Sequence, residues 1–134
     1  MIITYKFIKE LVEEKSGFLD IGLKSREQYM RDCRYTYCRL CFLYVDNFNL
    51  TKCGNEINRG HSNVLHAFTV FGKYYGTKSF LANNIFDICN PLLKYIYIDA
   101  VSKDTNEKIE SLNQLIKSYK SMRVKLIKEL NNKL

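Results

Sequence analysis

The stretch Arg59-Gly60-His61-Ser62-Asn63 carries the side chains best suited to recognition chemistry in this chain. Arginine bonds guanine edges in the DNA major groove, asparagine pairs with adenine, and serine bonds either kind of base. The stretch opens an apolar helical pattern, and a short amphipathic segment from Leu50 to Ile57 precedes it. Two such helices joined by a tight turn are typical of a helix-turn-helix, whose second helix enters the major groove.

The polar residues in and around this stretch have two expected roles on DNA: some read the bases, and others contact phosphate or the minor groove. Base reading is expected of Arg59, His61 and Asn63. Contacts to phosphate or to the minor groove are expected of Arg31, Arg34, Lys52, Ser62, His66 and Lys73. Such contacts raise affinity without carrying sequence information. Two of them have an equally simple alternative, since Ser62 could cap the second helix and His66 could be an ordinary helix histidine.

Zinc binding is the main competing chemistry. Cys38 and Cys41 are three residues apart, His61 and His66 follow, and Cys53 is a spare thiol. These residue types bind zinc, but the first two cysteines fall inside an apolar helical run, where cysteine serves as a small core residue. We therefore expect no metal and no cofactor. The cysteines and histidines lack an orienting carboxylate or an oxyanion-hole pattern, so we expect no catalysis.

The elements that position these residues are predicted to be helices, and the fold class all-α. One proline and six glycines interrupt 134 residues, which leaves few helix breakers. Apolar residues recur at helical spacing over residues 2–15, 25–46, 50–57, 61–75, 78–89 and 104–134. Ser25 with Gln28 has the form of a capping box, and Pro91 is expected to open a further helix. Val64, Leu65, Phe68 and Phe71 are the predicted inner face of the 61–75 helix.

The positive charge of the chain favours a polyanionic partner. Lysine and arginine number 21 against 14 acidic residues, for a net charge of +7. The excess lies in residues 26–76 and in residues 103–134. No stretch is apolar enough to cross a membrane, and the N-terminus lacks the features of a secretory signal. We expect a protein of the cytoplasm, associated with the nucleoid, or of the host cytoplasm if a phage encodes it.

The last predicted helix carries an apolar seam. Its residues recur at alternating spacings of three and four and form about three heptads. The seam consists of Ile109, Leu112, Ile116, Tyr119, Leu126 and Leu130, and Arg123 is its one polar position. Two interpretations are equally favoured. The helix either lies on its own domain or joins two copies into a homodimer. Its lysines form a solvated face, or alternatively a second phosphate-binding surface.

Residues 6–75 resemble the C-terminal DNA-binding domain of the bacterial replication initiator DnaA. The family's Arg-Asp-His-Thr-Thr-Val-x-His-Ala run stands here as Arg59-Gly60-His61-Ser62-Asn63-Val64-Leu65-His66-Ala67. Upstream, Leu50-Thr51-Lys52-Cys53-Gly54 parallels its Ser-Leu-x-x-Ile-Gly helix. Arg39-Leu40-Cys41-Phe42-Leu43-Tyr44 parallels its Arg-Gln-Ile-Ala-Met-Tyr segment, and Arg31 and Arg34 fall where the family has a basic stretch.

The resemblance implies double-stranded DNA binding, with residues matching Arg59, His61 and Asn63 in the major groove and the basic stretch near the minor groove. Gly60 replaces an acidic residue of the family and Asn63 replaces a threonine, so an altered base preference is expected. The ATPase motif Gly-x-x-x-x-Gly-Lys-Ser/Thr does not occur, so ATP-driven origin melting is not expected.

Three segments are therefore expected: a DnaA-C-terminal-like domain over residues 1–76, a helical extension over 77–103, and a long basic helix over 104–134. The expected function is sequence-specific binding of double-stranded DNA, as a small transcriptional regulator or replication accessory factor of a phage or mobile element. The alternative is a non-catalytic interaction or structural subunit that uses the last helix, with the helix-turn-helix not used on DNA.

Overall fold

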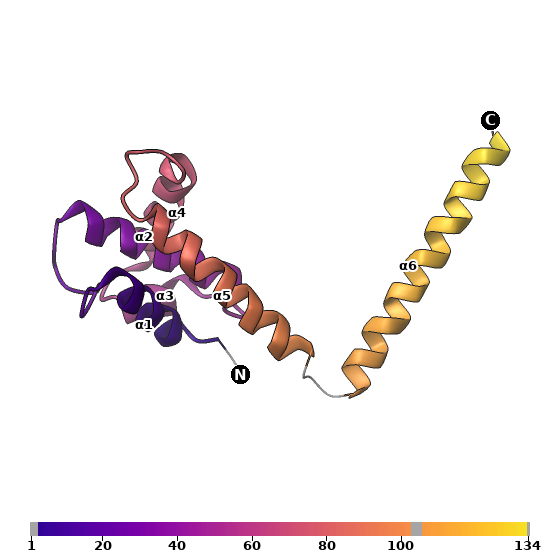
Figure 1. The fold of residues 1–134 in the computed structure, drawn as a ribbon, viewed down its shortest axis with the longest axis horizontal. Helices are drawn as coiled ribbons and strands as arrows, with labels where there is room; N and C mark the ends of the chain where they lie inside the picture. The colour runs from indigo at the N-terminus through magenta and orange to yellow at the C-terminus, as the bar shows by residue number, and fades with distance from the viewer. Residues whose placement is uncertain (1–2, 103–105, 134) are drawn as a thin grey trace. The chain divides into compact units, whose positions relative to one another are not determined.

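The computed structural model describes residues 3–102 and 106–133, and every regular element in these ranges is a helix (Figure 1). The helices are α1 (Tyr5–Ser16), α2 (Gln28–Tyr44), α3 (Leu50–Glu56), α4 (His61–Tyr74), α5 (Asn83–Ser102) and α6 (Asn106–Lys133). The predicted all-α class is confirmed. Packing divides the chain into two units, Met1–Ile98 and Asp99–Leu134. The predicted boundaries after residues 76 and 103 stay predictions.

The first four helices begin and end close to their predicted positions, and local signals set ends of α1 and α3. Gly17 follows α1 with a φ of 86°, the left-handed conformation that glycine adopts readily, and its N–H bonds the carbonyl of Glu13. Asn49 caps α3 by accepting a hydrogen bond from the N–H of Lys52. The predicted capping box is wrong, because α2 begins later and Ser25 Oγ accepts from the N–H of Glu27 instead.

Helix α5 differs from the prediction for its segment. Residues 78–82 lie outside any helix, and α5 then runs from Asn83 to Ser102 with Pro91 inside it. A proline removes one intrahelical hydrogen bond and normally ends or kinks a helix. Here Cys89 and Leu93, on either side of it, are fully buried in the core of the first unit. Tertiary packing thus holds the helix together where the local rule predicts a break.

Helix α2 lies at the centre of the first unit and contacts α1, α3 and α4 (Figure 1). It is buried on most of its circumference, at Met30, Asp32, Cys33, Arg34, Thr36, Tyr37, Cys38, Leu40 and Cys41. Cys38 and Cys41 are buried free thiols, as predicted for small core residues. Within residues 3–102 and 106–133, no three His, Cys, Asp or Glu side chains are grouped so that they could hold a metal ion.

Helix α4 packs on α2 with a narrower face than predicted. Val64, Ala67 and Phe71 are its buried residues. Leu65, predicted to face inward, is 50% exposed, and Phe68 is half-buried. Because one face of the helix makes the core contact, its remaining side chains stay available to a partner.

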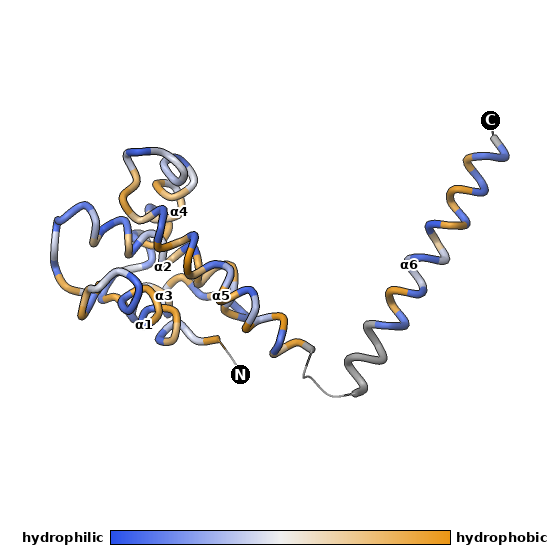
Figure 2. Tube along the Cα trace, in the orientation of Figure 1, coloured by the Kyte–Doolittle hydropathy of each residue, from blue (hydrophilic) through white to orange (hydrophobic). Residues whose placement is uncertain are grey.

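Helix α6 belongs to the second unit and is amphipathic, with hydrophobic and hydrophilic segments alternating along it (Figure 2). Of the predicted seam, Ile116, Tyr119, Leu126 and Leu130 are exposed within this chain. The side chains of Ile109 and Leu112 lie outside the described residues. Among the helices that the structure describes, none is both long enough and apolar enough to cross a bilayer.

Candidate nucleic-acid interface

A tight turn joins α3 to α4 and sets where the second helix begins. The N–H of Arg59 bonds the carbonyl of Gly54 at 2.8 Å, and Asn58 adopts a φ of 57°. Gly54 is the residue that permits this approach, because a Cβ atom there would stand 2.3 Å from the carbonyl oxygen of Arg59. The short helix, the turn and the second helix therefore depend on a glycine at position 54.

The first turns of α4 present polar side chains away from the core. His61, Ser62, Asn63 and His66 are all exposed. The N-cap of the helix is Gly60, so Ser62 is a helical residue and not the cap that the sequence allowed. His66 keeps one contact with α2, since its ring meets that of Tyr35 edge-on with centroids 5.9 Å apart. These four side chains are placed on one end of α4, as predicted.

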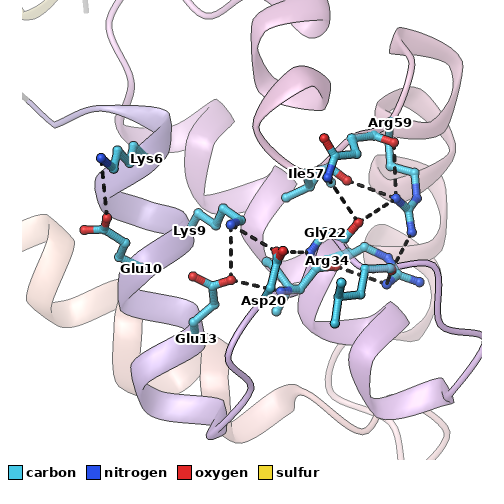
Figure 3. A network of polar contacts seen from close by, with 12 residues as sticks. Lys6, Lys9, Glu10, Glu13, Asp20, Gly22, Arg34, Ile57 and Arg59 are labelled. Carbon is cyan, nitrogen blue, oxygen red and sulfur yellow. Dashed lines mark hydrogen bonds and ion pairs between the residues drawn. The ribbon is translucent and has the colours of Figure 1, made fainter.

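The guanidinium of Arg59 is bonded to backbone carbonyls in the free protein. Its Nη1 donates to the carbonyls of Gly22, Ile57 and Asn58 at 3.0–3.2 Å, and its Nη2 donates to the carbonyl of Leu23 at 3.0 Å (Figure 3). A base edge would have to compete with these four acceptors. The structure thus gives Arg59 the role of joining the α3–α4 turn to the loop between α1 and α2. Base reading by this residue stays a prediction.

Arg34 was predicted to contact phosphate or the minor groove, but its side chain is buried and only 7% exposed. Its Nη1 donates to the carbonyls of Ile21 and Leu23, and its Nη2 to that of Ser25 at 2.8 Å. Burial, followed by the positive charge of Arg59, lowers the pKa of Arg34. An arginine remains protonated despite such a shift, so the buried charge is retained and solvated by backbone oxygens.

The loop that supplies these carbonyls is itself fastened to α1 (Figure 3). Lys9 Nζ lies 3.3 Å from a carboxylate oxygen of Glu13 and 3.1 Å from one of Asp20. Glu13 also accepts the N–H of Ile21, and Asp20 accepts the N–H of Gly22. The Gly22 N–H, followed by the hydrogen bond from Lys9, lowers the pKa of the Asp20 carboxyl. A continuous set of polar contacts therefore runs from α1 to the start of α4.

A hollow of about 210 Å³ lies between the start of α2 and the first two turns of α4. We call it the arginine hollow, because Arg26, Arg31, Arg34 and Arg59 line it, together with Asn63 and His66. None of its lining residues is acidic. A second hollow of about 410 Å³ continues along α2 and α4, shares Arg31 and His66, and includes Asp32. The structure therefore gathers five of the predicted site residues at one place.

Arg26 is a functional candidate that sequence reasoning missed. It precedes α2 in a loop, and nothing in its local pattern indicates that it would join the three other arginines. Lys52 and Lys73, predicted to contact phosphate, are exposed and line neither of these two hollows. Lys73 lies in the last turn of α4, with its ammonium 5.4 Å from the centroid of the Tyr74 ring. These two lysines are therefore separate from the main cluster of positive charge.

Comparison of the chain with known protein families, with curated proteins and with solved structures found no match. Its function is therefore inferred from its own residues, from their geometry and from the motif resemblance given above.

Proposed function

We propose that the protein binds double-stranded DNA sequence-specifically, with the first turns of α4 in the major groove. The observation that carries the proposal is the juxtaposition of exposed polar side chains on α4 with the carboxylate-free arginine hollow beside it. An α-helix fits the major groove, and an asparagine such as Asn63 can pair with adenine through two hydrogen bonds. The adjoining positive charge suits the phosphate backbone.

In this proposal the predicted base readers have different roles. His61 and Asn63 are exposed at the start of α4 and contact base edges. Arg59, bonded to four carbonyls, acts as a positioning residue that fixes α4 relative to the loop. Arg31 and Ser62 are exposed and contact the phosphate backbone of the DNA. Base discrimination then depends chiefly on two side chains.

The resemblance to the C-terminal domain of DnaA supports a role as a small transcriptional regulator or replication accessory factor acting at the nucleoid. Residues 6–75 carry the family's motifs in order, whereas the nucleotide-binding motif is missing from the sequence. Such a protein would mark a DNA site without supplying ATP-driven work. Gly60 and Asn63 depart from the family, so its target sequence is expected to differ.

Selection of bound sites from random duplexes, followed by fluorescence anisotropy on the selected site, tests the proposal. We expect an enriched motif and an affinity that falls steeply as salt rises, because phosphate contacts release counterions. Asn63→Ala should cost about 1–3 kcal/mol on the selected site and little on random DNA. Absence of binding at low salt, or binding insensitive to salt, would contradict DNA binding.

A second candidate function is that of an interaction subunit that uses α6, either alone or as the dimerising element of a DNA binder. The observation that favours it is the exposed apolar stripe of Tyr119, Met122, Leu126 and Leu130, each more than half exposed within this chain. Multi-angle light scattering distinguishes the cases, since a homodimer would double the mass. A dimeric DNA binder should also select a two-fold symmetric site.

A further inference from the structure

We propose that the arginine hollow is a preformed seat for a single phosphate group. The inference rests on the proposed function, because the phosphate would be one phosphate group of the bound DNA backbone. The chemistry of the seat is the same for a free oxyanion, and the experiment below separates the two sources.

The first argument is charge. Four arginines line the hollow, and none of its lining residues carries a carboxylate. In the part of the chain that the structure describes, the ion pairs join lysines of α1 to carboxylates, and none of these four arginines takes part. Of the two acids next to these arginines in sequence, Asp32 accepts the N–H of Leu81 and lines the neighbouring hollow, and Glu27 is exposed at the start of α2. Within the described residues, no ion pair therefore neutralises any of these four arginines in the free protein.

The second argument is preorganisation. Arg34 and Arg59 are held by backbone carbonyls before any ligand arrives, so their charges are fixed in place. Carbonyl oxygens orient a guanidinium without neutralising it. Arg26 and Arg31 line the same hollow, and because they are exposed their side chains can adjust to an oxyanion. A planar guanidinium matches phosphate geometry with two parallel hydrogen bonds. Two fixed charges together with two exposed, adjustable donors are suited to an anion.

The third argument is size and place. At about 210 Å³ the hollow lies below the range of roughly 300–1,000 Å³ typical of sites for drug-sized ligands, so it suits a phosphate group better than a whole nucleotide. Asn63 and His66 of α4 line the same hollow. A phosphate held there would lie beside the base-reading end of the helix. Phosphate contacts fix the register of a protein on a duplex, so this seat would set how α4 enters the groove.

Thermal unfolding of the full-length protein in phosphate, sulfate and chloride at matched ionic strength tests the seat. A ligand that binds only the folded state raises the unfolding temperature, so we expect phosphate and sulfate to raise it above its value in chloride. The variant Arg26→Gln/Arg31→Gln should lose this difference, since both side chains are exposed and removing them should spare the fold. The matched control Lys78→Gln/Lys94→Gln removes the same charge at two exposed lysines outside the hollow and should keep this difference.

Equal oxyanion shifts in both double variants, or no shift beyond chloride in the wild type, would overturn the seat. The DNA arm of the experiment measures affinity for DNA at several salt concentrations. The slope of log affinity against log salt concentration changes by about 0.9 for each phosphate neutralised. Two arginines sharing one phosphate predict a loss of about one in that slope for Arg26→Gln/Arg31→Gln. A loss near two would show separate contacts and contradict a single seat.

The two arms also separate this inference from the proposed function. Oxyanion stabilisation that depends on Arg26 and Arg31, without DNA binding, would support a seat for a free phosphate-bearing ligand and overturn the DNA source. DNA binding with no oxyanion effect and an unchanged salt slope in the variant would leave the proposed function standing and overturn the seat.

Discussion

Arg34 and Arg59 donate hydrogen bonds to the same acceptor, the backbone carbonyl of Leu23, at 3.2 and 3.0 Å. The first arginine belongs to α2, the second to the turn before α4, and the carbonyl to the loop between α1 and α2. Three segments distant in sequence thus meet at one oxygen. The orientation of α4 therefore depends on the loop between α1 and α2, which supplies backbone carbonyls. It also depends on two arginines of like charge that these carbonyls hold near each other.

Replacing Arg34 by alanine should lower the free energy of unfolding by about 3 kcal/mol, because part-buried carbonyls would lose charge-assisted hydrogen bonds and a void would remain. Urea denaturation measures the change. Arg31→Ala is the matched control, since this arginine on the same helix is exposed and should cost less than about 0.5 kcal/mol. Similar losses in the two variants would contradict the assigned role of Arg34.

Replacing Arg59 by alanine should weaken binding to selected and random DNA together, because its loss frees the α3–α4 turn from the loop and alters the orientation of α4. Parallel anisotropy titrations on both duplexes measure the two affinities. A direct base reader would behave differently, losing about 1–3 kcal/mol on the preferred site alone. Relaxed preference at one base pair in Arg59→Ala would therefore restore the base-reading role.

The helices around the site could be predicted from the sequence because their signals are local. Apolar spacing and the caps at Gly17 and Asn49 are read within one or two turns of chain. The burial of Arg34 could not be predicted, because its partners are main-chain carbonyls 9–13 residues away, which leave no side-chain signature. The unbroken course of α5 through Pro91 likewise depends on core packing and not on the local rule.

For the candidate site, the sequence predicted which residues α4 presents at its start better than it predicted where the arginines lie. His61, Ser62 and Asn63 share the exposed end of α4, as expected from the start of the helical pattern. Arg26 lines the hollow together with residues of α2 and α4, and this tertiary arrangement leaves no local pattern in the sequence. Arg59 has the residue type of a base reader, yet its direction is set by carbonyls that the sequence does not reveal.

Gly54→Ala should destabilise the protein by about 1–3 kcal/mol, since the added methyl would overlap the carbonyl oxygen of Arg59 and force the turn to shift. Gly72→Ala on α4 is the control, because a Cβ there meets nothing within 4 Å. Within a helix that change should stabilise by roughly 0.5–1 kcal/mol. Thermal or urea unfolding gives both values, and equal effects would argue against a tight turn.

The contact of Asp20 with Gly22 and Lys9 predicts a loss of stability in acid. The pKa of the Asp20 carboxyl is lowered in the folded state from 3.8, so its contribution is present above that value and disappears as pH falls through the lowered pKa. The advantage of wild type over Asp20→Asn should therefore shrink as urea midpoints are measured from pH 7 toward pH 2. A difference that is constant across this range would exclude the ionised carboxylate as its cause.

Gly60→Asp tests whether the departure from the DnaA pattern alters base preference. Gly60 is the N-cap of α4 with a φ of −80°, and a Cβ there meets nothing within 4 Å, so the side chain fits. Aspartate and asparagine are both good N-caps and should stabilise the helix by a few tenths of a kcal/mol over glycine. Gly60→Asn is therefore the control that adds the cap without the charge. We expect site selection to give a motif shifted toward cytosine with aspartate, whose carboxylate accepts from that base, and toward adenine with asparagine. The same motif from all three proteins would mean that position 60 does not face the bases.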